Sequence, residues 1–218
     1  MILFFLFFML IVSFFVYWCI NEKIGLQLGI VVSFSAWIVL LIEHLDIKFP
    51  FNIDIRFVVF PLFFFGYLFL RNKIEALLAK GGFRAGIISA AILSFLMILY
   101  RPGLEFILPG GVVLGLGTGY CINKRFVCFK SANCLQRKGA SKFFTLFARF
   151  ILGITVLALI VFRVEKIIQH ISENQNIFLY TFLCCAVTSL WVSVAAPWVF
   201  IKLRLANIDI SSEQPHDK

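Results

Sequence analysis

Residues 177–201 read IFLYTFLCCAVTSLWVSVAAPWVFI, a run without a single Asp, Glu, Lys or Arg. A helix that crosses the hydrocarbon core of a membrane needs roughly 20 mostly apolar residues, with a range of about 17–25. This stretch has that length and that composition. It therefore predicts a transmembrane helix rather than a helix in the core of a soluble domain.

The rest of the chain repeats this pattern. The mean hydropathy is +0.99, 61% of the residues are hydrophobic, and 28 of them are Phe. Soluble domains usually hold about 45–50% apolar residues, so most of this chain needs lipid as its solvent. We predict an all-α, polytopic transmembrane helix bundle of seven spans, at residues 2–20, 25–42, 57–70, 85–100, 104–122, 143–162 and 177–201.

The basic residues between the spans predict the orientation. Cytoplasmic loops carry an excess of Lys and Arg. With seven spans, one side of the membrane receives only Lys48, Arg56, Arg101, Arg163 and Lys166, whereas the other receives most of the 20 Lys and Arg. The N-terminus is therefore predicted outside and the C-terminus inside. Residues 1–204 form one transmembrane domain, and 205–218 form a short polar cytoplasmic tail.

Glycines recur at every fourth position in residues 110–119, GGVVLGLGTG. Gly111, Gly115 and Gly119 share one face of a helix, and small residues at this spacing let two membrane helices approach closely. A phosphate-binding loop would need a following Lys-Ser/Thr and a preceding strand, and neither is present. We therefore assign these glycines to helix packing.

Two histidines are candidates for acid–base chemistry. His44 lies between Glu43 and Asp46, and His170 falls on the same predicted outer side. A histidine beside a carboxylate can transfer protons or bind a metal. The alternative is that both are solvated residues of unrelated loops, and Glu105 likewise fits a place at the headgroups.

The sequence predicts no cofactor, and it predicts membrane lipids as the partners of the basic loop. The six cysteines form no CxxC pair and lack a nearby histidine, so no metal site is expected. The loop 123–142 is basic and is expected to contact anionic lipid through Lys124, Arg125, Arg137, Lys138 and Lys142. Arg149, near the start of the sixth span, can snorkel to the near interface. No nucleic acid partner is expected, and any protein partner or homo-oligomer stays open.

Three segments carry a family resemblance. The first is YWCINEKIG at 17–25 with SAW at 35–37, the second is GLGTGY at 115–120 with NKRFV at 123–127, and the third is LW at 190–191 with APWVF at 196–200. In this order they resemble bacterial membrane proteins of the phosphatidic acid phosphatase type 2 family. The resemblance implies a helical membrane fold and, in active members, hydrolysis of a lipid phosphate.

The catalytic motifs of that family are not intact in this chain. The family uses KxxxxxxRP, PSGH and SRxxxxxHxxxD, which supply cations for the phosphate, an acid histidine and a nucleophilic histidine held by an aspartate. Here residues 43–50 read EHLDIKFP, so Glu43 stands where the lysine belongs and Phe49 where the arginine belongs. Asp54 resembles a remnant of the orienting aspartate, and the central segment with PSGH is missing.

Three functions follow as hypotheses. The first is a catalytically degenerate relative of the phosphatase family in a bacterial inner membrane, serving as a lipid- or partner-binding scaffold. The second is an active lipid phosphate phosphatase that uses His44 or His170 with Asp46, Asp54 or Glu105. The third is a small transporter-like binder, although such proteins usually show intramembrane charge or paired broken helices.

Overall fold

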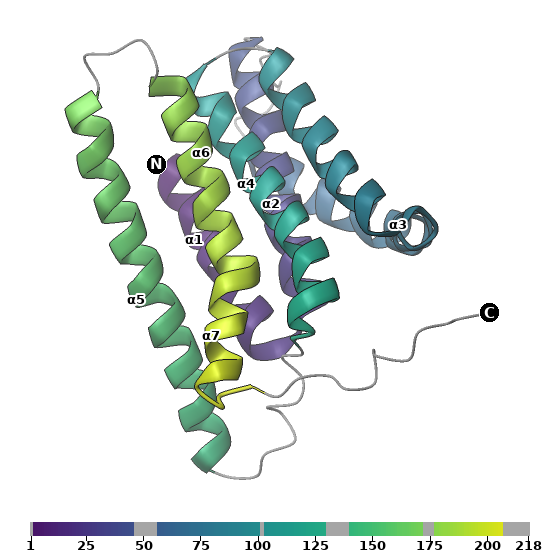
Figure 1. The fold of residues 1–218 in the computed structure, drawn as a ribbon. Coiled ribbons are helices and arrows are strands. Elements are labelled where there is room, and N and C mark those ends of the chain that lie inside the picture. Colours follow the sequence, from purple (N-terminus) through teal and green to yellow (C-terminus); the bar gives the residue numbers. More distant parts are fainter. Residues whose placement is uncertain (1, 46–55, 101–102, 130–139, 172–176, 207–218) are drawn as a thin grey trace.

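The computed structural model describes residues 2–45, 56–100, 103–129, 140–171 and 177–206, and these parts of the chain are built from helices (Figure 1). The elements are α1 (Ile2–Phe15), η1 (Val16–Ile20), α2 (Glu22–His44), α3 (Arg56–Tyr100), α4 (Leu104–Ile122), η2 (Asn123–Val127), α5 (Ala140–Ile171), α6 (Ile177–Leu190), η4 (Trp191–Ala195) and α7 (Ala196–Lys202). The η elements are single turns of π-helix. The all-α prediction is confirmed.

Within the described residues, five helices are long and apolar enough to cross a membrane: Glu22–His44, Gly82–Leu99, Glu105–Val127, Phe143–Arg163 and Ile177–Lys202. Two shorter apolar helices, Phe8–Ile20 and Val58–Tyr67, lie at the first and third predicted spans. The chain is therefore a multi-pass membrane protein, as predicted. The count of seven spans and the orientation remain predictions.

The connection expected between the third and fourth spans is helical instead. Helix α3 continues through this region and breaks at Gly82, whose φ is 66° and ψ is −169°. The residues before the break, RNKIEALLAK at 71–80, are mostly good helix formers, and glycine adopts positive φ without steric cost. Figure 1 shows that the two parts of α3 run in different directions.

Helix α4 lies at the centre of the bundle, packed against α2, α3 and α6. Its glycines line two faces. A Cβ added at Gly115 would lie 2.4 Å from the carbonyl oxygen of Ala186 in α6, and one at Gly117 would lie 2.6 Å from the Cβ of Ala90 in α3. Ser94 of α3 also donates a hydrogen bond to the Gly110 carbonyl at 2.8 Å. The absence of side chains at these glycines thus lets α4 pack closely against both α6 and α3.

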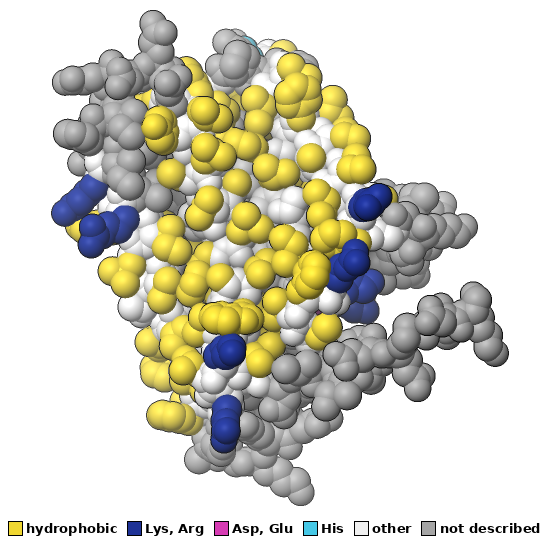
Figure 2. Space-filling model, viewed as in Figure 1, with side chains coloured by type: hydrophobic (Ala, Val, Ile, Leu, Met, Phe, Trp, Pro, Cys, Tyr) yellow, Lys and Arg dark blue, Asp and Glu magenta, His cyan; other side chains and the backbone are white. Residues whose placement is uncertain are grey.

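The outer surface of the bundle is apolar. Side chains such as Leu62, Phe95 and Leu159 are more than half exposed. Figure 2 shows hydrophobic side chains spread over the middle of the molecule, with lysine and arginine side chains gathered along its flanks and lower end. A soluble monomer rarely exposes so continuous an apolar surface, whereas a helix bundle surrounded by lipid does.

A buried polar junction as the candidate functional site

Most of the backbone irregularities of the described chain gather at one end of the bundle. The π-helical turns η1, η2 and η4 meet there, with contacts between η2 and η4 and between α5 and both η1 and η4. In the described residues, the non-glycine residues with positive φ are Cys128, which follows η2, and Arg204, which follows α7. Single π-helical turns and left-handed residues are uncommon and concentrate at functional positions. We call this region the polar junction and define it by Tyr17, Trp18, Asn123, Arg149 and Ser193.

The irregular turn η4 leaves two backbone carbonyls without their usual α-helical hydrogen-bond donors. Pro197 has no N–H to donate to the Ser193 carbonyl four residues earlier. The N–H of Ala196 donates to the carbonyl of Trp191, five residues back, which leaves Val192 without its usual α-helical donor. A buried carbonyl without a partner costs about 1–3 kcal/mol, so both oxygens need donors from elsewhere.

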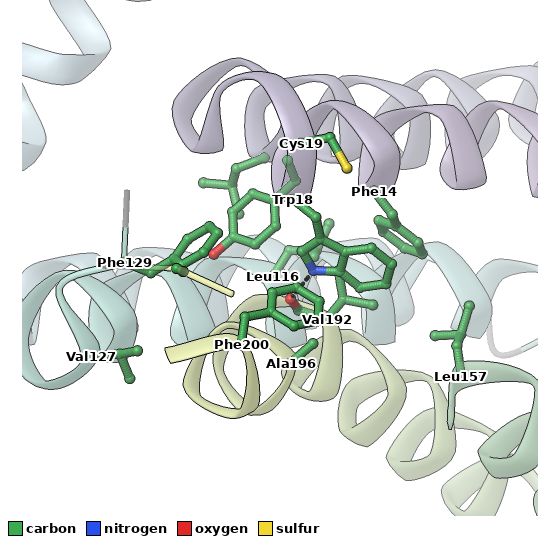
Figure 3. Packing of buried hydrophobic residues seen from close by; sticks show 13 residues of the cluster. Phe14, Trp18, Cys19, Leu116, Val127, Phe129, Leu157, Val192, Ala196 and Phe200 are labelled. Atoms are coloured by element: carbon green, nitrogen blue, oxygen red, sulfur yellow. Dashed lines mark hydrogen bonds between the residues drawn. The ribbon is translucent and has the colours of Figure 1, made fainter. Parts of the chain in front are cut away.

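The donors come from the N-terminal helix. The hydroxyl of Tyr17 donates to the Ser193 carbonyl at 2.8 Å, and the indole N–H of Trp18 donates to the Val192 carbonyl at 3.0 Å. Figure 3 shows Trp18 directed at Val192, with Phe200 and Ala196 beside it. Two adjacent residues of η1 thus satisfy the two carbonyls that η4 and Pro197 leave open. These two hydrogen bonds connect the N-terminal helix to the last transmembrane helix.

Asn123 adds a third connection. Its side-chain amide donates to the Tyr17 hydroxyl at 2.7 Å, and its side-chain oxygen accepts from the Phe129 N–H at 3.3 Å. Cys128, with φ 51°, reverses the chain between these two residues. The aromatic ring of Phe129 therefore turns back onto the junction, where it lies 6.3 Å from the ring of Tyr17 and 6.3 Å from that of Phe200.

Arg149 in α5 is fully buried, with 0% of its surface exposed. Its Nη1 donates to the Trp18 carbonyl at 3.1 Å, and its Nε and Nη2 donate to the Leu205 carbonyl at 3.0 and 2.5 Å. Its guanidinium also lies 5.6 Å from the centre of the Phe129 ring. These carbonyls belong to the ends of two helices, where the helix dipole is negative and a cation is stabilised.

The expectation that Arg149 reaches out to the membrane interface is therefore wrong. The side chain points inward because the chain offers it a better partner there. Arg204, with φ 57°, ends α7 in a left-handed turn, and the N–H groups of Leu205 and Ala206 return to the Phe200 carbonyl. This turn places the Leu205 carbonyl in front of the guanidinium.

An apolar shell encloses the junction. Trp18 is completely buried among Phe14, Leu157 and Phe200, and its ring contacts the backbone of α5 where Gly153 has no side chain. A Cβ at Gly25 would lie 2.2 Å from the backbone nitrogen of Tyr17, so α2 and η1 also meet without a side chain between them. Exclusion of water strengthens each hydrogen bond inside this shell. The arrangement holds helices together.

The residues predicted to carry acid–base chemistry whose side chains are described lie outside the polar junction. Glu43 and His44 are exposed at the end of α2, and Glu105 is exposed at the start of α4. Asp46 and Asp54 lie outside the described residues, and His170 lies in α5 with its side chain outside them. The part of the chain that the structure describes contains no group of three or more His, Cys, Asp or Glu suited to a metal ion.

The predicted lipid-contacting residues are described only in part. Lys124 and Arg125 are exposed on η2. Arg137 and Lys138 lie outside the described residues, and Lys142 lies in α5 with its side chain outside them. The glycines predicted to pack helices face α6 and η4, where an added Cβ at Gly111 would lie 2.8 Å from the Cβ of Cys185 and one at Gly119 would overlap Ser193.

The junction itself was not predicted from the sequence. A basic residue within an apolar run was the available signal, because ionisable residues inside membranes usually have a specific partner. A second signal was Pro197 within the last span, since a proline in a transmembrane helix leaves a carbonyl for another group to satisfy. Neither signal names the partner, which in both cases lies far away in the sequence.

Comparison with known proteins finds one family model that matches part of the chain. Residues 107–208 match the model of the PAP2 superfamily phosphatase, transmembrane extension. No curated protein and no solved structure matches the chain. The matched region supports a PAP2-like integral membrane protein, and it contains Asn123, Arg149 and Ser193. Tyr17 and Trp18 precede the matched region and bond directly into it.

Proposed function

We propose that this chain is a catalytically degenerate PAP2-like membrane protein that acts as a lipid- or partner-binding scaffold. The observation that carries the proposal is the use made of the buried polar groups. Tyr17, Trp18 and Arg149 donate hydrogen bonds to backbone carbonyls, and such bonds stabilise the packing of helices. The departures of residues 43–50 from the phosphatase motif support the same conclusion, as does the match of residues 107–208 to the transmembrane extension of the PAP2 superfamily.

The proposal predicts no hydrolytic activity. Purified protein in detergent micelles is expected to release no phosphate from phosphatidic acid or undecaprenyl pyrophosphate above a protein-free blank. An active phosphatase of the same family, assayed in the same micelles, shows that the substrates are accessible. Turnover by the wild-type protein that is lost in His44→Ala or in His170→Ala would show an active enzyme and would refute the proposal.

We further propose seven spans, with the N-terminus outside a bacterial inner membrane and the C-terminus in the cytoplasm. The distribution of Lys and Arg supports this orientation. The two exposed residues His44 and Arg204 then lie on opposite sides. In a cysteine-free background expressed in bacteria, we expect His44→Cys to react with a membrane-impermeant maleimide in spheroplasts, and Arg204→Cys to react only after permeabilisation. Labelling of both from one side would contradict the topology.

A further inference from the structure

A second cluster of charged and aromatic residues lies outside the polar junction, where α3 breaks and η2 begins to turn. Arg84 follows Phe83 in α3, Lys124 precedes Arg125 in η2, and all three basic side chains are exposed. Figure 2 shows a group of basic side chains on the right-hand flank of the molecule, bordered by hydrophobic side chains. Two neighbouring aromatic residues, Phe83 and Phe126, belong to the same cluster, because their rings lie 6.0 Å apart at nearly right angles.

The guanidinium of Arg125 is positioned by both rings. It lies 4.9 Å from the centre of the Phe83 ring and 5.6 Å from that of the Phe126 ring. A guanidinium stacked on an aromatic ring uses its flat face for this contact, and its N–H groups lie along its edge. That edge matches the oxygens of a phosphate group, to which arginine can donate two parallel hydrogen bonds.

The contact joins two elements that come from different parts of the chain. Phe83 follows the Gly82 break in α3, and Arg125 lies in the π-helical turn η2. The side chain of Phe126 is 69% exposed, which gives the cluster an apolar surface beside its cationic one. A phosphate with a hydrocarbon chain attached would satisfy both surfaces at once.

We propose that Arg84, Lys124 and Arg125, with Phe83 and Phe126, bind the headgroup phosphate of an anionic phospholipid. Arg125 contacts the phosphate, Arg84 and Lys124 add positive charge, and Phe126 lies against the start of an acyl chain. This inference rests on the proposed scaffold function and specifies its lipid ligand. It assigns the lipid contact predicted for the basic segment 123–142 to one site that includes two aromatic rings.

The experiment measures lipid binding by native mass spectrometry of the full-length protein in detergent, titrated with phosphatidylglycerol. A basic residue near an anionic membrane contributes about 1 kcal/mol, so Arg125→Gln is expected to weaken binding about fivefold. Phe83→Leu keeps the charge but removes the ring, and it should weaken phosphatidylglycerol binding in the same direction. Phosphatidylcholine is expected to bind weakly to all variants.

The matched control is Arg204→Gln, which removes an exposed cation from the turn that follows α7 without touching the cluster. We expect this variant to bind phosphatidylglycerol as the wild-type protein does. Glycerol 3-phosphate, which has the phosphate but no acyl chain, is expected not to compete. Equal weakening by Arg204→Gln and Arg125→Gln would show unspecific charge attraction and overturn the site, as would full binding by Arg125→Gln.

These outcomes are independent of catalysis. Loss of the lipid site would leave the phosphate-release result unchanged, and a protein that hydrolyses phosphatidic acid could still show the predicted dependence on Arg125. The thermal stability of each variant in detergent without added lipid verifies that weaker binding does not come from misfolding.

Discussion

Replacement of Arg149 by methionine is expected to lower the free energy of unfolding by about 2–6 kcal/mol, because two carbonyls lose their donor and each buried, unsatisfied carbonyl costs about 1–3 kcal/mol. Methionine keeps the length of the side chain and fits the apolar shell, but it has no hydrogen-bond donors. The carbonyls of Trp18 and Leu205 would then be buried without the donors that Arg149 supplies. Replacing both partners of a buried ion pair by apolar side chains can leave the free energy of unfolding unchanged or raise it. Here the partners are backbone atoms, which no side-chain substitution can remove.

The measurement is unfolding in mixed detergent micelles, followed by circular dichroism. Arg163→Met serves as the control, because Arg163 lies on the same helix α5 and is exposed. It should unfold close to the wild-type protein. Arg149→Lys keeps the charge but loses the forked geometry that reaches two carbonyls, so its stability should fall between those of wild type and Arg149→Met. A wild-type stability for Arg149→Met would show that the junction does not hold the helices together.

The helices could be predicted from sequence because each membrane span is a local pattern. An apolar run such as residues 177–201 is recognisable without knowledge of the other helices. The segment around Gly82 was harder, because its composition fits both a polar loop and a helix. The structure continues the helix up to the glycine, which alone tolerates the positive φ found there.

The polar junction depends on distances in sequence that no local pattern records. Arg149 and Trp18 are separated by 131 positions, and Tyr17 and Ser193 by 176. Near the start of an apolar run, an arginine has a plausible route to water, so the sequence favoured snorkelling. Only the packed bundle shows that the ends of η1 and α7 bring their carbonyls to this side chain.

The predicted acid–base residues and the residues of the polar junction are of different types. A search for acid–base chemistry selects histidines and carboxylates, of which His44 and Glu105 are exposed. The buried polar side chains of the junction include Tyr17, Asn123, Arg149 and Ser193, and none of them is a histidine or a carboxylate. Pro197 can be read directly from the sequence, and it removes the N–H that would donate to the Ser193 carbonyl. The sequence does not show that the Tyr17 hydroxyl replaces this donor.

Substitution of Gly115 by leucine is expected to lower the free energy of unfolding by about 3 kcal/mol or more, at the upper end of the cost of overpacking. Even a Cβ at this position would lie 2.4 Å from the Ala186 carbonyl oxygen and 2.5 Å from the Ser189 Cβ. The nearest obstacle is backbone, which cannot rotate away as a side chain can. Helix α6 would have to move away from α4, and the contacts between η4 and the junction would be strained with it.

Gly66→Leu provides the matched control, because Gly66 also lies in a helix and an added Cβ there would meet nothing within 4 Å. Leucine favours helix by up to about 1 kcal/mol over glycine, so this variant should be as stable as wild type or slightly more stable. Gly115→Ala should fall between wild type and Gly115→Leu. If Gly115→Leu and Gly66→Leu unfold alike in the same micelles, α4 and α6 do not pack as closely as the structure places them.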